Sequence, residues 1–313
     1  MGKYILKRLF SLIPIIIGIS IIVFLIIHLV PGDPASIILG NNATPEAIKA
    51  LNAKLGLDKP LIVQYFDWVV HLIQGNFGTS VQTDQSVLPT LINKFLVTFQ
   101  LTLLSVLIGW IIAIPLGILS AVKANSVVDF ILRIISMLGI SIPNFAIGTL
   151  LLLILSVYFG WYPPIDYVNF WDDPISALKI FILPAITMGI VLSAGIMRMT
   201  RTSFIETLNK DFIRTARAKG NPEGTVIVGH GLRNSMIPII TIGGMQIGYL
   251  LGGAVIVEQL FSIPGIGQYI LNGIYHRDFP VVQGGVLFIS LIFVFVNLIV
   301  DIIYCWIDPR IKY

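Results

Sequence analysis

Basic side chains gather in one polar segment of the sequence, between Arg198 and about Ser235. Guanidinium and ammonium groups at this density can form ion pairs and charge-assisted hydrogen bonds with acidic or carbonyl groups. They outnumber the carboxylates of the segment by seven to three. The basic residues are Arg198, Arg201, Lys210, Arg214, Arg217, Lys219 and Arg233, and the acidic ones are Glu206, Asp211 and Glu223.

The chain lacks the usual sequence patterns of nucleotide binding, hydrolysis and metal binding. It contains no G-x-x-x-x-G-K-[ST], no G-x-S-x-G and no H-E-x-x-H. Its four histidines have no close Cys or His at ligand spacing; they are His28, His71, His230 and His276. We therefore expect no catalytic residue, no bound cofactor and no metal site, so the energy for any work must come from another protein.

Composition places the chain in a membrane. It is 56% apolar and 12% charged, with a mean hydropathy of +0.91, whereas soluble domains are about 25% charged. The net charge of +4 does not indicate nucleic-acid binding, because Lys and Arg concentrate beside apolar runs. The single Cys305 cannot form an internal disulfide.

Six apolar runs are long enough to cross a membrane as helices, since a bilayer core of about 30 Å needs about 20 residues. They cover residues 9–30, 97–122, 131–159, 178–199, 236–258 and 282–306. The first run is too long for the apolar core of a typical signal peptide and lacks an evident cleavage site, so we interpret it as an uncleaved anchor. The fold predicted is an all-α polytopic membrane protein.

Lys and Arg are distributed unevenly along these runs. An orientation with both termini inside places 14 of the 20 Lys and Arg on the cytoplasmic side. The inside groups are Lys3, Lys7 and Arg8, then Lys123 and Arg133, the seven of the basic segment, and Arg310 and Lys312. Positive charge favours the cytoplasmic side, so we predict an N-in, C-in topology with the basic segment inside.

The first outside loop, residues 31–96, is long enough to hold helices. Thr44 followed by Pro45 is typical of a helix start, and Gly56 is suited to end that helix. An amphipathic stretch over residues 60–74 stops at Gly75. The loop is either a cap packed beside the bundle, which we favour, or a surface for an external partner.

The basic segment itself is expected to be structured. A short helix should end at Gly220, followed by a turn over residues 221–224, Asn-Pro-Glu-Gly, and a second short helix that leads into the next span.

Here the sequence resembles the dipeptide/oligopeptide/glutathione/nickel family of ABC-importer permeases. Gly220 stands at the glycine of the cytoplasmic coupling-loop signature, Arg-Thr-Ala at 214–216 replaces its Glu-Ala-Ala, and His-Gly-Leu-Arg at 230–233 replaces its Ile-x-Leu-Pro. Three further segments agree: Val-Pro-Gly-Asp-Pro at 30–34, Phe-Ser-Ile-Pro-Gly-Ile-Gly at 261–267, and Asn-Leu-Ile-Val-Asp at 297–301 with Asp-Pro-Arg at 308–310.

The resemblance implies one permease domain over residues 1–313, with an extracytoplasmic loop subdomain at 31–96 and a cytoplasmic coupling loop at 200–235. The coupling residues would be Arg214, Thr215, Ala216, Arg217, Ala218, Lys219, Gly220, Glu223, His230 and Arg233. The implied partners are a second homologous permease forming a heterodimer, two cytoplasmic ATPases that carry ATP and Mg, and an extracytoplasmic binding protein. The implied location is the bacterial cytoplasmic (inner) membrane, where the chain contacts membrane lipid. No nucleic-acid partner is implied.

Within the coupling loop, Ala216 and Gly220 are four residues apart and share a face if one helix runs through both. These small residues would let the loop approach an ATPase closely, with Arg217 and Lys219 free for its acidic or carbonyl groups. The alternative is that Gly220 merely ends a helix.

Small residues recur along the fifth apolar run. Gly244, Gly248 and Gly252 lie at i, i+4 and i+8, which allows another helix to approach closely. They either pack within the bundle or, as the resemblance implies, line a translocation path. A weaker version, Gly109, Ala113 and Gly117, favours ordinary packing.

Prolines mark bends and a gate. Pro115, Pro143 and Pro184 fall in or near spans and can kink them. Pro264 and Gly265 favour a tight turn outside the fifth span, which by resemblance helps to form an external gate.

The function expected is uptake of dipeptides, oligopeptides or glutathione, with a nickel or metallophore permease as the alternative within the family. A stand-alone secondary transporter would need carboxylates near mid-membrane or an internal repeat of helices, and neither is visible in the sequence. Asp301 is the deepest ionisable residue by sequence and could belong to a proton relay, but the resemblance gives it a structural role. A non-transporting scaffold for the outer loop is a third possibility.

Overall fold

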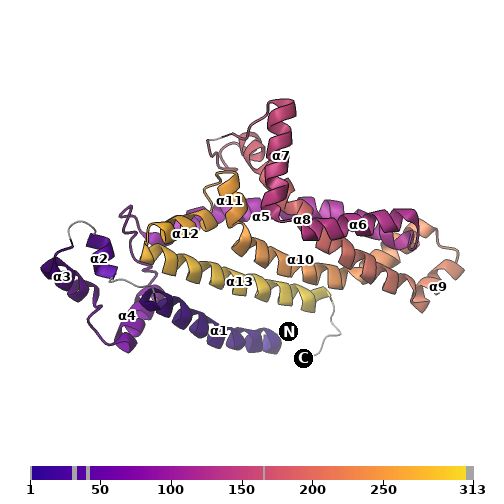
Figure 1. Cartoon of the computed structure of the whole chain (residues 1–313). Coiled ribbons are helices and arrows are strands. Elements are labelled where there is room, and N and C mark those ends of the chain that lie inside the picture. Colours follow the sequence, from indigo (N-terminus) through magenta and orange to yellow (C-terminus); the bar gives the residue numbers. More distant parts are fainter. Residues whose placement is uncertain (1, 30–33, 40–42, 165, 308–313) are drawn as a thin grey trace. The chain divides into compact units, whose positions relative to one another are not determined.

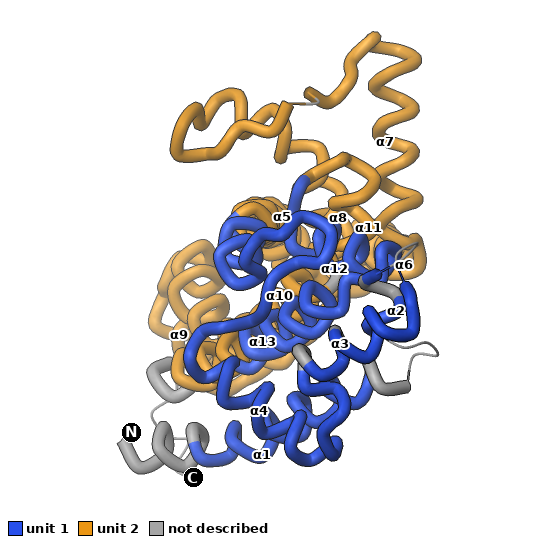
Figure 2. Tube along the Cα trace, turned by 90° about the vertical axis from the view of Figure 1, so that its left-hand side faces the viewer, with its two compact units in different colours: residues 1–96, 264–294 blue, residues 97–263, 295–313 orange. Residues whose placement is uncertain are grey.

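The computed structural model describes residues 2–29, 34–39, 43–164 and 166–307 (Figure 1). These residues are mostly helical, and Thr79 and Ser86 form an isolated β-bridge. The all-α prediction is confirmed for this part of the chain. Two compact units are distinguished in Figure 2: residues 1–96 with 264–294, and residues 97–263 with 295–313.

The first unit contains the N-terminal helix and the helices of the loop that follows it. Its elements are α1 (Gly2–Leu29), α2 (Pro34–Leu39), α3 (Pro45–Leu55), α4 (Leu61–Ile73), the start of α5 (Val87–Val122), α12 (Ile266–Tyr275) and the start of α13 (Phe279–Ile307).

The predicted helix boundaries in the outer loop are confirmed. The Thr44 hydroxyl accepts a hydrogen bond from Ala47 N at 3.2 Å, and Gly56 ends α3 in the left-handed conformation, at φ +68°. Helix α4 ends at Ile73, just before Gly75, which has φ +78°.

Helix α4 has one packed face and one exposed face. The Tyr65 hydroxyl lies 2.8 Å from Ser20 Oγ of α1, and its ring meets Phe24 edge-on. On the other face, Ile62 and Ile73 are 72% and 81% exposed. Helix α4 therefore packs on α1, and apolar side chains remain exposed on its other side. That the loop caps the bundle stays a prediction.

A small core closes the first unit. Val87 and Leu91 of α5 pack with Ile266 and Ile270 of α12. Beside them, the buried Asp278 accepts a hydrogen bond from Ser80 Oγ at 2.6 Å.

The second unit holds the larger core. Its elements are the rest of α5, α6 (Val127–Ser141), α7 (Asn144–Phe159), α8 (Pro174–Leu208), α9 (Asp211–Ala218), the π-helix η2 (Thr225–Leu232), α10 (Arg233–Gly253), α11 (Val255–Leu260) and the end of α13.

Helix α8 is the centre of this unit, with 72% of its most apolar stretch buried. Helix α5 crosses it closely: a Cβ at Gly109 would lie 3.1 Å from the carbonyl oxygen of Gly189, and one at Gly117 would lie 2.8 Å from that of Met197. Ala113 between them is fully buried. The packing interpretation of these small residues of α5 is confirmed.

Among the residues that the structure describes, four helical segments are long and apolar enough to cross a membrane: Val87–Val122, Pro174–Leu208, Thr225–Gly252 and Phe279–Ile303. They match the second, fourth, fifth and sixth predicted runs. The first run lies in α1, whose apolar part among the described side chains is Phe10–Ile26.

The third predicted run is not one straight helix. It is divided into α6 and α7, which meet at an angle of 102° (Figure 1). Pro143 has no backbone N–H and pushes the preceding residue out of the helical region, so Ile142 is extended, with φ −88° and ψ 125°. The kink expected at Pro143 is thus a break, whereas Pro115 and Pro184 lie inside continuous helices.

Candidate functional site

The candidate coupling loop folds around a small core of its own. Ile213 and Ala216 of α9 pack on Val226 of η2, and all three are buried. Leu208, at the end of α8, completes the cluster. Ile213 and Ala216 are three residues apart, so they share one face of α9, while charged residues occupy other faces. A helix of only eight residues is held by this tertiary packing rather than by its own propensity.

Gly220 ends α9 and does not lie in it. The helix stops at Ala218, Lys219 follows as the cap, and Gly220 adopts φ +76°. That conformation favours glycine, and the space where a Cβ would stand is open. The expected helix end is confirmed.

The expectation of a shared small-residue face is wrong on two counts. No helix runs through both Ala216 and Gly220, and Ala216 is 6% exposed because it faces the core of the loop. Its smallness serves packing against Val226, and Asn221 Nδ2 donates to its carbonyl oxygen at 3.1 Å.

Arg217 is paired inside the loop. Its Nη2 lies 2.7 Å from Glu223 Oε1 and its Nε lies 3.2 Å from Oε2, a two-point contact across the Gly220 turn. The hydrogen bond from Arg217 lowers the pKa of Glu223. Arg217 is thus engaged by a neighbour, whereas Lys219 has no ion pair among the residues that the structure describes.

The remaining predicted loop residues are at the surface. Arg214 makes a loose pair with Asp211 at 3.5 Å, and Thr215, Ala218 and Arg233 are exposed. His230 is half-buried at the end of η2. Two apolar side chains on this surface were not predicted: Phe212 is 39% exposed and Val228 is 61% exposed.

Both ends of the loop are fastened to long helices. Ser203 Oγ of α8 donates to the carbonyl oxygen of Ser235 in α10 at 3.0 Å, and both residues are buried. Gly231 of η2 lies against the ring of Phe204, where a Cβ would stand 2.8 Å from Cζ. A displacement of the loop therefore acts on α8 and α10 together.

A buried ion pair near the base of α8 escaped the sequence reasoning. Arg201 holds Asp129 of α6 at two points, with Nε 2.7 Å from Oδ1 and Nη2 2.8 Å from Oδ2. The Asp129 side chain is fully buried and also accepts from Ser120 Oγ at 2.7 Å. The two partners are 72 residues apart, so no local pattern could have joined them; the signal available was an acidic residue three positions after the cap Ser126.

Another buried carboxyl lies at the end of the fifth predicted run. Glu258 of α11 is fully buried and accepts a hydrogen bond from Thr98 Oγ1. A Glu at the end of an apolar run was a visible signal, because such a group needs a polar partner when buried.

The glycines of α10 differ in their surroundings. Gly244 is buried against α13, where a Cβ would lie 2.7 Å from Val300 Cγ1, and Gly243 is buried against Trp110. Gly248 is buried and Gly252 is exposed. Close helix packing is evident at Gly244, and the role of the stripe in a path stays a prediction.

A cavity of about 460 Å³ opens where α6 and α7 meet, facing α8, α10 and α11. Ser141, Asn144, Gln246 and Tyr249 supply its polar side chains. The Gln246 Oε1 atom is buried and receives no hydrogen bond from the described residues. These side chains, rather than the predicted glycines, line the space.

The predicted gate segment is mostly buried, although Ser262 is exposed and Pro264 is half-buried. Gly265 is extended, with φ −82° and ψ −179°, and precedes α12, while the left-handed residue of the segment is Ser262, with φ +54°. The position predicted for the turn, Pro264 and Gly265, is therefore wrong, because the chain turns earlier, at Phe261 and Ser262. A gating role stays a prediction. The Val-Pro-Gly-Asp-Pro and Asp-Pro-Arg segments fall mainly on 30–33 and 308–310, outside the described residues.

Comparison with known proteins identifies this architecture. Residues 113–313 match the family of binding-protein-dependent transport system inner membrane components, and residues 1–102 match the N-terminal part of such membrane components. Together the two matches cover most of the chain. The chain belongs to this family.

Full-length relatives of this permease are permeases of transport systems. It is 41% identical over 313 residues to the glutathione transport system permease protein GsiC of Salmonella choleraesuis (strain SC-B67), and the match covers all of both chains. It is 41% identical over 333 residues to the dipeptide transport system permease protein DppB of Alkalihalophilus pseudofirmus, again over both whole chains. The resemblance seen in the sequence is confirmed.

The fold of the permease is shared with a solved transporter. A chain of the MetNI methionine ABC transporter, in an inward-facing conformation, matches with a TM-score of 0.54 at 18% identity. The match covers 70% of this chain and 96% of that chain. Family and apolar helices together establish a multi-pass component of the bacterial inner membrane, which works within a binding-protein-dependent system.

Proposed function

We propose that this permease carries short peptides, either dipeptides and oligopeptides or glutathione, into the cytoplasm as part of an ATP-driven importer. The observation that carries the proposal is identity of 41% over the whole chain to both a glutathione and a dipeptide permease. The names of these relatives give two substrates, glutathione and dipeptides, which share amide bonds, a free ammonium group and a free carboxylate. A short peptide is therefore the common chemistry.

The assembly proposed is a heterodimer of this chain and a second, similar permease, with two ATPases inside and a binding protein outside. ATP and Mg belong to the ATPases, since the sequence has no nucleotide-binding motif. Six spans with both termini inside place the coupling loop in the cytoplasm, in line with the distribution of Lys and Arg.

The geometry of the loop supports a coupling role. It has a buried core, so it can receive a force as one body, and an exposed outer surface with Phe212, Val228 and Lys219 for contact. It is tied to α8 through Ser203 and Phe204. ATP-dependent contacts on this surface would shift the population between two packings of the bundle.

The cavity at the α6–α7 break is proposed as part of the route. Its unpaired Gln246 carbonyl can accept hydrogen bonds from the amide or ammonium groups of a peptide, and Asn144 can donate or accept. A route for peptides with variable side chains needs groups that recognise the backbone and a largely apolar lining elsewhere.

Uptake into proteoliposomes tests the function. The permease pair, the ATPases and the binding protein are reconstituted with ATP inside, and labelled dipeptide, glutathione and nickel are offered in separate arms. ATP-dependent uptake of a peptide supports the proposal. Uptake of nickel alone would indicate the metal-transport alternative. Uptake by this chain without ATP would indicate a secondary transporter. No uptake with every partner present would indicate a non-transporting protein.

Thiol labelling tests the orientation. In a variant that lacks Cys305, cysteines replace the exposed residues Gln74 and Ala218 one at a time. An impermeant reagent added outside intact cells should label position 74 and not position 218. Labelling of position 218 from outside would overturn the N-in, C-in arrangement.

A further inference from the structure

A pocket of about 200 Å³ lies between α5, α6 and α8, close to the Asp129–Arg201 pair. Three arginines line it: Arg133 of α6, and Arg198 and Arg201 of α8. The rest of its lining is mostly apolar and includes Leu132 and Met197. A cationic rim on an apolar pocket matches a ligand that has an anionic group attached to hydrocarbon.

The charges of this pocket do not cancel. Asp129 is the acidic group beside it, and its two oxygens already accept from Arg201, from Ser120 Oγ and from the backbone N of Asn125. Arg133 Nε stays 3.7 Å from the nearer oxygen, which is beyond a hydrogen bond.

Arg198 is exposed and has no ion pair among the residues that the structure describes. Three arginines against one carboxylate leave an excess of two positive charges. Arg198 can therefore hold an anion, and so can Arg133, which is held only by the loose 3.7 Å pair with Asp129 and by its position 5.9 Å from the centre of the Phe130 ring. Guanidinium geometry matches the paired oxygens of a phosphate group.

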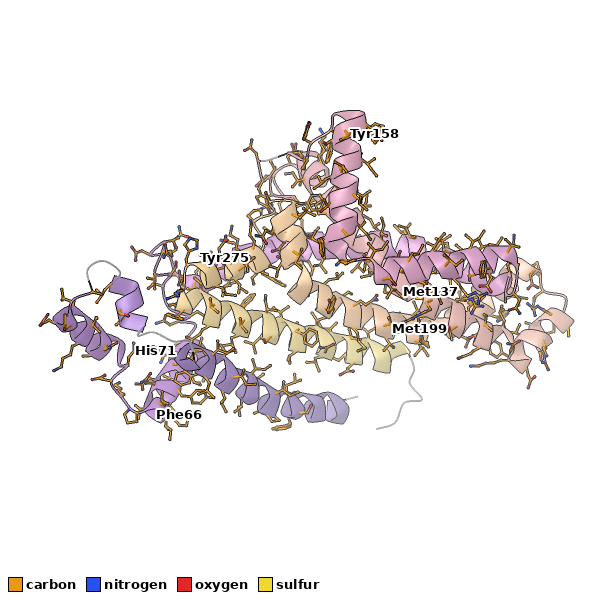
Figure 3. All side chains as sticks on the ribbon, viewed as in Figure 1. Phe66, His71, Met137, Tyr158, Met199 and Tyr275 are labelled. Carbon is orange, nitrogen blue, oxygen red and sulfur yellow. The ribbon has the colours of Figure 1, made fainter. Side chains whose placement is uncertain are left out.

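The adjoining surface of α6 is apolar. Phe130, Ile134, Met137 and Leu138 are between 41% and 63% exposed. Met137, which also lines the pocket, is labelled on α6 in Figure 3. An acyl chain lying along this face would run directly from a head group held in the pocket.

We propose that the pocket binds the phosphodiester head group of an anionic phospholipid from the cytoplasmic leaflet, with Arg133 and Arg198 on the phosphate and the acyl chains along α6. The inference rests on the proposed orientation, which sets the basic end of α8 at the inner boundary of the membrane. Basic pockets between helices at this boundary attract anionic head groups.

The volume fits such a group. By this measure a cavity needs only about 10–15 Å³ to hold one water molecule, so a pocket of about 200 Å³ has room for a phosphate with part of its glycerol. The lipid would join α6 to α8 beside the ion pair that already joins them. This places a lipid contact on the C-terminal part of α8, the helix that leads into the coupling loop.

Lipid retention tests the proposal. The assembled complex is purified in detergent, exposed to phosphatidylglycerol or to zwitterionic phosphatidylcholine, and analysed by native mass spectrometry. Wild type should retain phosphatidylglycerol preferentially. Arg133→Gln and Arg198→Gln should each reduce that retention about fivefold, and the double variant about thirtyfold.

Two variants serve as controls. Lys123→Gln removes an exposed cation of the α5–α6 turn that does not line the pocket, and should retain lipid like wild type. Arg198→Lys keeps the charge and should retain most of the lipid. Asp129 and Arg201 are left intact in every variant, so the pair that joins α6 and α8 is preserved.

Three results would overturn the inference. Equal retention by the double variant and wild type would exclude the pocket, and equal retention of phosphatidylcholine would exclude charge recognition. Displacement of the lipid by millimolar inorganic phosphate or glycerol phosphate would show a site for free phosphate instead. The measurement uses neither ATP nor peptide, so its outcome is independent of whether the complex transports peptides.

Discussion

Two arginine–carboxylate pairs of this permease have nearly the same geometry and different surroundings. Arg201 holds Asp129 with two hydrogen bonds of 2.7 and 2.8 Å, and the Asp129 side chain is fully buried. Arg217 holds Glu223 with bonds of 2.7 and 3.2 Å, but these side chains are 44% and 56% exposed. The first joins two long helices, and the second closes one turn of the coupling loop.

This difference shows that burial, and not the hydrogen-bond geometry, decides how much such a pair contributes to stability. An exposed pair is screened by water and salt and contributes about 0–1 kcal/mol. Removal of one partner from a buried pair leaves an uncompensated charge, which costs about 3–5 kcal/mol. The Asp129 pair therefore holds the C-terminal part of α8 against α6, whereas the Glu223 pair can open when a partner protein binds.

The largest effect is expected from Asp129→Ala. Arg201 would lose its counter-charge, and the variant should lose about 3 kcal/mol of stability, near the low end of the range because the arginine is 21% exposed. The midpoint of thermal unfolding of the purified permease complex measures this. Asp211→Ala, which removes the exposed partner of Arg214, is the matched control and should change the midpoint little.

Gly220→Leu is expected to have the next largest effect. The left-handed backbone would be strained by about 1–2 kcal/mol, and the side chain would project from the outer surface of the loop. The variant should insert and bind its permease partner, yet lose ATPase association in a pull-down and lose ATP-driven uptake.

Gly220→Asn separates the two causes, because asparagine tolerates the left-handed conformation better than leucine. We expect weaker ATPase association here too, since the new side chain occupies the open space at the surface. Association equal to wild type would mean that Gly220 serves only to end α9.

Glu223→Ala should change stability by less than about 1 kcal/mol, because the pair is exposed. A double-mutant cycle with Arg217→Ala gives the coupling free energy directly. A coupling as large as that between Asp129 and Arg201 would contradict the distinction between the two pairs.

The smallest effect concerns pH. Arg217 lowers the pKa of Glu223 below its ordinary value of 4.5, so the pair stabilises the loop at pH values above 4.5. This contribution is lost as the pH falls through the lowered pKa. Hydrogen exchange over residues 211–225, compared with Glu223→Gln at each pH, should show equal protection at low pH and a small excess for wild type at neutral pH.

Local signals in the sequence were sufficient where the structure is locally determined. Thr44 and Gly56 bound α3, and Gly220 ends α9, because capping depends on a few neighbouring residues. The packing role of the α5 glycines was predictable, because residues without a side chain on one helix face let another helix approach closely.

The features that could not be predicted from the sequence depend on contacts between elements that are distant in the chain. The kink at Pro143 was predictable, but its 102° angle depends on what α6 and α7 pack against. Asp129 and Arg201 meet across 72 residues, and the burial of Ala216 depends on Val226 of the next element. Sequence spacing could place Ala216 on a face but could not tell which way that face turns.

The π-helical form of η2 sets the phase of the helix that follows. A π turn holds about one residue more than an α turn, and one residue corresponds to about 100° of rotation. The side chains of α10 that meet the cavity, Gln246 and Tyr249, therefore owe their direction to the eight residues of η2. A single deletion within Thr225–Leu232 would rotate α10 about its axis and turn Gln246 and Tyr249 away from the cavity, with no substitution in α10 itself.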